Sequence, residues 1–319
     1  MLSTRPPLCP MSWPCAGRRA ALKTGRLALH TLLACVLSLS LSSRLAAAPA
    51  LAPLEVVYPR PESPSDTRYQ DLIELLRGAL EHTRASDGPY VLRPSGAQMN
   101  EARQLMELQQ GKEITVAWSS TSIEKERVLL PLRIPLRKGL LGYRIALIRK
   151  DEQARIDQVQ TLDDLKRLRI GQGVGWGETN LYAANGLSLV SAQYDSLFKM
   201  VARQRFELLP RGINEVFKEY ELHRDELPEL TVEQHLLIQY TWPYYFFFNK
   251  KDLPLQRRIE TGLRAMMKDG SYDALFEKYS RADIQRARLA GRRIIRLNNP
   301  LLPPQTPLDD KSLWFDPQR

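Results

Sequence analysis

The sequence predicts an α/β protein in two lobes, each a mostly parallel sheet flanked by helices, with a hinge of two strands between them. Segments of strand and helix character alternate along the chain, and the alternation occurs twice, before and after about residue 142. Alternation at this spacing is typical of parallel strands joined by crossover helices. Two long apolar segments, 140–149 and 235–250, are the expected crossings between the lobes.

The first set of elements starts with a strand over 54–58. Prolines and serines then predict a loop that ends in a helix N-cap at Ser65 or Asp66. Apolar residues at helical spacing follow over 67–80. A strand at 90–93, a helix over 102–110 closed by Gly111, and a strand at 114–118 complete the set.

The second set follows the first long strand. Its expected elements are a helix capped by Thr161, a strand from 169 into a glycine-rich turn, a helix at 177–185, a strand at 187–190, a helix at 194–203 and a strand at 206–209. Helices at 254–268 and 271–280 come after the second long strand.

These elements divide the chain into five expected segments. They are a signal peptide at 1–50, the first part of lobe one at 51–145, lobe two at 146–242, the return to lobe one at 243–285 and an extended tail at 286–319. The prolines after residue 299 disfavour regular structure in the tail, and its leucines with Trp314 and Phe315 predict packing on lobe one.

The first fifty residues have the order of a secretory signal peptide: basic residues, then about 17 uncharged residues over 27–43, then small residues. A transmembrane anchor is the alternative, but the run is short, serine-rich and followed by alanines at cleavage spacing. Cleavage is expected after Ala48 or Ala50, which predicts a periplasmic protein.

R-R-A-A-L-K at 18–23 resembles a twin-arginine signal, yet Ala21 stands where that signal prefers a large apolar residue, which favours the general secretory route. L-L-A-C at 32–35 resembles a lipoprotein cleavage site, but the apolar run continues beyond it.

Composition narrows the function. The three cysteines, at positions 9, 15 and 35, all lie in the expected leader, so the mature chain has no disulfide and no thiolate nucleophile. Without the six basic residues of the leader, 40 basic residues face 36 acidic ones, a net charge of +4. The basic residues are interspersed with acidic ones, so we expect no nucleic-acid partner.

The motifs resemble those of a known family, the periplasmic solute-binding proteins of the type 2 fold, family 3, best known for amino-acid uptake. S-I-E-K-E-R at 122–127 is similar to the T-I-T-x-E-R-like motif after their third strand, and G-V-G-W-G-E-T at 173–179 to the turn of their second lobe. G-S-Y-D-A-L-F-E-K-Y at 270–279 is similar to their late-helix signature. The resemblance implies two lobes that close over a small-molecule ligand, a monomer without cofactor, and an inner-membrane ABC permease as partner. A periplasmic sensor for a membrane receptor is the alternative.

The expected ligand site has a wall in each lobe. Parallel sheets bind ligands beyond the carboxyl ends of their strands, where residues 119–127 lie. Ser120 and Ser122 offer hydroxyl groups and Arg127 a planar fork that suits a carboxylate. The resemblance implies that these three residues hold the carboxylate of the ligand. Glu124 departs from the family, and a solvated, N-capped surface helix is the alternative interpretation.

Lobe two is expected to contribute Gly175, Trp176 and Thr179, because a glycine-rich turn lets the backbone approach a ligand and exposes amides at a helix N-terminus. No Gly-Lys-Ser/Thr follows, so this is not a nucleotide-binding P-loop. Trp176 either closes over the ligand or packs between the lobes. Tyr58 and Trp242 are candidate cleft aromatics.

The largest departure from the family lies at 203–216, where amino-acid binders carry an aspartate for the ammonium group of the ligand. This chain has Arg211, with Glu215 just beyond. If Arg211 faces the cleft, a ligand with two anionic ends is favoured; if Glu215 does, an ammonium group is still held, and either residue could be a surface charge. His82, His223 and His235 have no metal-ligand spacing or nucleophile motif beside them, so we expect neither a metal site nor an enzyme. An enzyme on the same scaffold is the third alternative for the function, after a binding protein for transport and a sensor.

Overall fold

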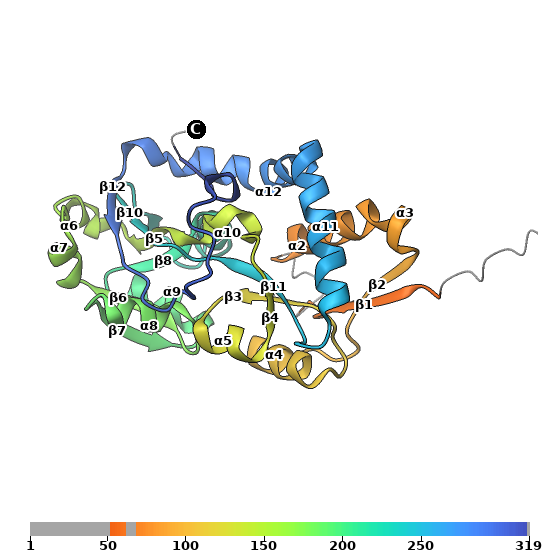
Figure 1. Cartoon of the computed structure of the whole chain (residues 1–319). Coiled ribbons are helices and arrows are strands. Elements are labelled where there is room, and N and C mark those ends of the chain that lie inside the picture. The colour runs from red at the N-terminus through yellow and green to blue at the C-terminus, as the bar shows by residue number, and fades with distance from the viewer. Residues whose placement is uncertain (1–51, 62–67, 318–319) are drawn as a thin grey trace, which may run out of the picture. The chain divides into compact units, whose positions relative to one another are not determined.

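The computed structural model describes residues 52–61 and 68–317, which belong to one compact unit (Figure 1). Its strands are β1 (Leu54–Tyr58), β2 (Tyr90–Pro94), β3 (Ala117–Ser120), β4 (Leu130–Leu132), β5 (Tyr143–Arg149), β6 (Arg169–Gly173), β7 (Ser188–Ala192), β8 (Leu209–Gly212), β9 (Leu230–Val232), β10 (Leu236–Gln239), β11 (Tyr244–Phe248) and β12 (Arg293–Arg296). Its α-helices are α2 (Gln70–His82), α3 (Arg84–Asp87), α4 (Glu101–Gln110), α5 (Ile123–Val128), α6 (Gln153–Ile156), α7 (Leu162–Lys166), α8 (Glu178–Ala184), α9 (Tyr194–Ala202), α10 (Ile213–His223), α11 (Leu253–Asp269) and α12 (Ser271–Ala287). The 3-10 helices are η1 (Leu136–Gly142), η2 (Lys150–Glu152), η3 (Leu289–Gly291) and η4 (Lys311–Leu313). The expected signal peptide and the N-cap expected at Ser65 or Asp66 lie outside the described residues.

The described strands form two larger sheets and two pairs. The first sheet has the order β3-β11-β4, and the second has the order β12-β10-β5-β8, with β9 also paired to β5. The pairs β1-β2, β6-β7 and β10-β12 are parallel. Strands β5 and β11 run antiparallel to all of the strands with which they pair. The α/β fold is as predicted, but the larger sheets are not mostly parallel. Every pairing in the first sheet is antiparallel, and in the second only β10-β12 is parallel, because β5 and β11 of the crossing segments run in the reverse direction.

Helices α2 and α11 lie side by side (Figure 1). The apolar residues of α2 recur at helical spacing and form its buried face, from Leu72 to Leu80. A Cβ atom at Gly262 in α11 would lie 2.0 Å from the carbonyl oxygen of Ala79. The two helix backbones therefore touch, and only glycine fits at residue 262.

The chain crosses between the two larger sheets by short connections that lie against each other. The segment predicted as one strand over 140–149 is η1 followed by β5, and the second long segment is split into β10 and β11 around Pro243. The amide of Tyr240 donates to the carbonyl of Gly142 at 3.0 Å, and a Cβ atom at Gly142 would lie 2.0 Å from the oxygen of Tyr240. The first connection (η1) and the second connection (240–243) are thus in direct backbone contact.

The C-terminal segment corrects one prediction. It was expected to be extended and packed on lobe one, but Arg293–Arg296 form β12, which pairs in parallel with β10 in the second sheet. Helix α12 contacts α2 and α11 at one part and α10 at another, so it makes a third passage of the chain toward the second sheet. The prolines that argued against regular structure start only after β12, at Pro300.

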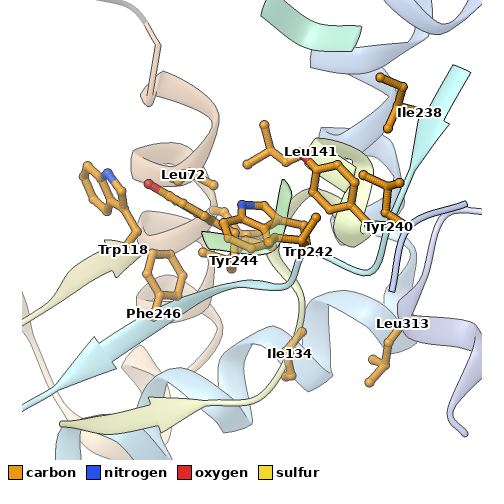
Figure 2. Packing of buried hydrophobic residues seen from close by; sticks show 14 of the residues in the cluster. Leu72, Trp118, Ile134, Leu141, Ile238, Tyr240, Trp242, Tyr244, Phe246 and Leu313 are labelled. Atoms are coloured by element: carbon orange, nitrogen blue, oxygen red, sulfur yellow. The ribbon is translucent and has the colours of Figure 1, made fainter. Parts of the chain in front are cut away.

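Residues of both connections belong to one apolar cluster (Figure 2). Tyr240, Trp242, Tyr244 and Phe246 belong to it, because alternate residues of an extended segment point to the same side. Trp118 of β3 belongs to the same cluster. The cluster therefore holds β3 and the second connection together, and the candidate site is built from both segments.

Candidate ligand-binding site

The carboxyl end of β3 is occupied by a lysine. Ser122 is the N-cap of α5 and accepts a hydrogen bond from the amide of Lys125 at 3.2 Å. The Lys125 Nζ atom donates to the Ser119 hydroxyl at 2.6 Å and to the Ser120 carbonyl at 3.0 Å, and it pairs with Glu101 at 3.1 Å. The ammonium group of Lys125 therefore lies over the serines that the sequence selected.

Arg127, the expected anchor, does not join them. Its side chain is exposed and makes no hydrogen bond or ion pair with the part of the chain that the structure describes. Residues two apart in a helix point about 200° apart, so Lys125 and Arg127 face opposite sides of α5. The structure brings Lys125, not Arg127, to Ser120.

The glycine-rich turn meets this wall directly. A Cβ atom at Gly177 would lie 3.2 Å from the Trp242 ring and 3.4 Å from the Ser120 hydroxyl oxygen. Gly175 has a φ of 83°, in the left-handed region that favours glycine. Ser120 and Trp242 thus lie together with the turn that begins α8.

Trp176 packs on the protein. A Cβ atom at Gly173 would lie within 2.2 Å of the Trp176 ring, and the Arg211 guanidinium stacks over that ring at 4.4 Å. The half-buried indole is therefore held between β6 and β8, both of which lie in the expected lobe two. The hydroxyl of Thr179 is buried and has no hydrogen-bond partner among the described residues.

Five charged side chains form a connected group beside this turn, which we call the ionic cluster: Arg144, Glu178, Arg211, Glu215 and Glu219. Arg144 of β5 pairs with Glu178 at the start of α8 and with Glu215 at 3.1 Å. Arg211 of β8 holds Glu219 with two hydrogen bonds of 2.6 and 2.7 Å. Strands β5 and β8 are neighbours in the second sheet, and Arg144 lies opposite Gly212, so the two guanidinium groups come from adjacent strands.

Glu215 joins the two halves of the cluster. Its Oε2 atom accepts from the Gly212 amide at 2.8 Å and lies 3.1 Å from Arg144 and 3.4 Å from Arg211. Burial alone would raise the pKa of Glu215, but Arg211, Arg144 and the Gly212 amide lower it to about 2. Its side chain keeps 30% of its surface exposed, against 5% for Arg144 and 8% for Arg211. The most accessible charge of the three is therefore a carboxylate.

The charges of the cluster do not cancel. Three carboxylates face two guanidinium groups, so the ionic cluster carries a net charge of −1. The ion pair of Arg137 with Asp71 adds no net charge, because the guanidinium group binds the carboxylate through two hydrogen bonds of 2.5 and 2.7 Å. A ligand that meets this surface is favoured if it brings a positive group.

Three aromatic residues from the first part of the chain, Tyr58, Tyr69 and Trp118, pack in a row. Burial raises the pKa of Tyr69, Arg68 and Arg137 lower it, and the carboxylates of Glu101 and Glu215 raise it further. Tyr69 packs on Trp118 at 5.5 Å between ring centres, and Trp118 stacks on Tyr58 at 6.2 Å. Tyr58 thus lies at one end of a row of three aromatic rings.

Sequence reasoning missed Arg144, Glu178 and Lys125. A signal existed for Arg144, which lies within the apolar segment L-L-G-Y-R-I-A-L-I-R, where a buried charge requires a partner. Its Nε atom and the Oδ1 atom of Asn214 are buried and have no partner among the described residues, so the surroundings of the cluster keep unused donors and acceptors. Lys125 gave no such signal, because its motif position matches no ligand contact of the family.

Within 52–61 and 68–317, no group of three or more His, Cys, Asp or Glu side chains is arranged to hold a metal ion. No helix in these ranges is both long and apolar enough to cross a membrane.

No family model matches the sequence, and no curated protein does. Solved structures do. YckB from Bacillus subtilis is 18% identical, with a TM-score of 0.50, over 76% of this chain and 96% of that chain. The amino acid ABC transporter substrate-binding protein AbpA from Streptococcus pneumoniae, bound to L-arginine, is 16% identical, with a TM-score of 0.50, over 72% and 95%. A histidine kinase sensor domain similar to periplasmic binding proteins is 16% identical, with a TM-score of 0.47, over 72% and 96%. The chain therefore has the α/β fold of the type 2 solute-binding proteins.

Proposed function

We propose that the protein is an exported solute-binding protein that captures a small polar ligand between two lobes for an ABC-type uptake system. The ligand carries a positive group that meets Glu215 and a carboxylate that meets the end of β3. Binding shifts the protein toward a closed form by its differential affinity for the two arrangements. The permease then recognises that closed form.

One observation carries the proposal: Glu215 is a partly exposed carboxylate that buried cations keep ionised. Its Oε2 atom is used by Arg144, Arg211 and the Gly212 amide. Its Oε1 atom has no hydrogen bond to the described residues, and the cluster carries one negative charge in excess. A charge-assisted hydrogen bond to a ligand ammonium or guanidinium group satisfies both. This favours a zwitterion over the ligand with two anionic ends that Arg211 alone suggested.

The carboxylate end rests on the residues around Ser120. The hydroxyls of Ser120 and Ser122 are donors there. Lys125 Nζ is 26% exposed and already contacts Glu101, Ser119 and Ser120, so the ligand carboxylate would replace one of these acceptors. Arg127 can take part only if its exposed side chain turns back toward Ser120. The two residues are therefore competing anchors, and the proposal gives the role to Lys125.

A thermal-shift screen of the protein expressed from the full-length sequence tests the ligand class. Amino acids, diamines and dicarboxylates are compared at equal concentration; a ligand at 100 times its Kd adds about 2.7 kcal/mol. We expect stabilisation by a zwitterionic compound and none by a dicarboxylate. Stabilisation by dicarboxylates alone would refute the assignment of Glu215.

Variants then locate the two ends. Lys125→Met is expected to weaken binding of the identified ligand roughly tenfold or more, the usual effect of a lost charged hydrogen bond. Arg127→Met is the matched control on the other face of α5 and is expected to leave the affinity unchanged. The reverse result would restore Arg127 as the anchor.

A further inference from the structure

The C-terminal strap, which we define as residues 297–315, runs back over the connections between the two larger sheets. It starts directly after β12. The Leu297 amide donates to the Gln239 carbonyl at 2.8 Å, which extends the pairing with β10 to its last residue. The Asn185 side chain then donates to the Asn298 carbonyl at 2.7 Å and accepts from the Asn298 amide at 3.0 Å. The strap is thus fastened to the second sheet and to the end of α8.

The next residue binds the second connection. Asn299 is buried, and its Nδ2 atom donates to the carbonyl oxygen of Thr241 at 2.9 Å. Thr241 lies in the short segment between β10 and β11. This hydrogen bond ties a backbone group of the connection itself, where a change of lobe orientation would turn the chain.

The far end of the strap binds the first connection. A Cβ atom at Gly139 would lie 2.7 Å from the Trp314 ring, so the indole rests on the η1 backbone. The Phe315 amide donates to the Lys138 carbonyl at 2.8 Å, and the Tyr143 hydroxyl donates to the Phe315 carbonyl at 3.0 Å. Leu313 is buried in the large apolar cluster beside them. One end of the strap therefore covers η1 and the start of β5.

The covered backbone is unusual. Arg137, Lys138 and Gly139 have φ values of 55°, 50° and 71°, three successive left-handed residues of which two carry side chains. Non-glycine residues rarely adopt this conformation, and it persists only where surrounding contacts enforce it. Trp314 and Phe315 supply such contacts at Lys138 and Gly139.

We propose that the strap is a clamp on the hinge that holds the arrangement in which Ser120 lies against Gly177. It binds both connections at once, at Thr241 and at Lys138 to Tyr143, and these connections touch each other at Gly142 and Tyr240. Release of the strap allows the left-handed residues of η1 to relax and the two sheets to reorient. The inference rests on the contacts of the strap and uses no ligand, so it stands or falls separately from the proposed function.

Distance measurements between two spin labels test the clamp. In the full chain with Cys9, Cys15 and Cys35 replaced by serine, labels are attached at Met106→Cys in α4 and Leu222→Cys in α10, which are 47% and 74% exposed. Trp314→Ala is expected to add a population with a changed distance. Leu308→Ala, a 43% exposed residue of the same strap, is the control and is expected to leave the distribution unchanged. A folded Trp314→Ala protein with the parent distribution would overturn the proposal.

Hydrogen exchange separates a clamp from a segment that merely stabilises the fold. The Tyr240 amide, which donates to Gly142, is expected to exchange roughly tenfold faster in Trp314→Ala, while the amides of β1 and β6 keep their rates. Equal acceleration of all amides would mean global destabilisation and contradict the clamp. If Trp314→Ala fails to fold, Asn299→Ala removes the other attachment, and the same localised increase is expected; its absence there counts against the proposal.

Discussion

Glu215→Gln is the substitution from which the electrostatics of the cluster can be measured. Glutamine keeps the shape of the side chain and can still accept from the Gly212 amide, but it removes the charge that Arg144 and Arg211 face. A fall of the pKa from 4.5 to about 2 corresponds to about 3 kcal/mol of folding free energy. Because the pKa in the folded protein is depressed, this stabilisation is present above pH 4.5 and is lost as the pH falls toward 2.

Urea unfolding of the parent and the variant at several pH values is the assay. We expect the parent to be more stable by about 3 kcal/mol at pH 7, and the gap to narrow progressively below pH 4.5. Asp225→Asn, at a side chain that is 94% exposed, controls for removal of a carboxylate and is expected to show no such gap. A gap that stays constant from pH 7 to pH 3 would show that the lost stability is not electrostatic. No gap at all would mean that Arg144 and Arg211 are satisfied without Glu215.

Three further outcomes follow from other parts of the chain. Arg292→Ala removes the cation that pairs with the fully buried Glu233 at 2.6 Å and should lower the free energy of unfolding in urea by about 3–5 kcal/mol. The decrease should be smaller at low pH, where Glu233 takes up a proton. Arg293→Ala, at an exposed residue, is the control. Gly139→Ala forces a side chain into a left-handed residue under the Trp314 ring and should lower stability by about 1–3 kcal/mol, whereas Gly291→Ala, where a Cβ atom meets nothing within 4 Å, should have little effect. N-terminal sequencing of the exported protein should begin at Pro49 or Leu51, and a start at Met1 would contradict the signal peptide.

Local patterns in the sequence were enough to place most of the regular elements. The first strand coincides with β1. The expected helix at 194–203 ends one residue after α9, and the one at 254–268 is one residue shorter than α11 at each end. Both helices have a clear apolar face, and that periodicity is a property of the segment alone. The expected strand at 206–209 was shifted, because β8 starts at Leu209 and ends at the glycine that precedes α10. Phe206 and Leu208 are as buried as the strand residues, so apolarity could not mark its start.

The candidate site was less accessible to such reasoning. The motif at 119–127 indicated the end of β3, but the choice between Lys125 and Arg127 depends on which face of a six-residue helix meets the serines. That orientation is fixed by the Ser122 cap and by Glu126, which is buried and bonded to Thr121 at 2.7 Å. Partners that fix a short helix in this way come from tertiary packing, which spacing alone does not reveal.

The charge of a site is a property of the whole set of side chains and not of any one of them. Arg211, taken singly, suggested an anionic ligand, because an arginine stands where the resemblance leads one to expect an acid. In the structure Glu219 binds its guanidinium group twice and Glu215 lies 3.4 Å away, so Arg211 has little positive charge left to offer. Arg211 acts on Glu215 instead, because together with Arg144 it lowers the pKa of that carboxyl group and keeps it ionised. The same arginine therefore argues for a positive group on the ligand once its partners, which lie four and eight residues further along one helix, are taken into account.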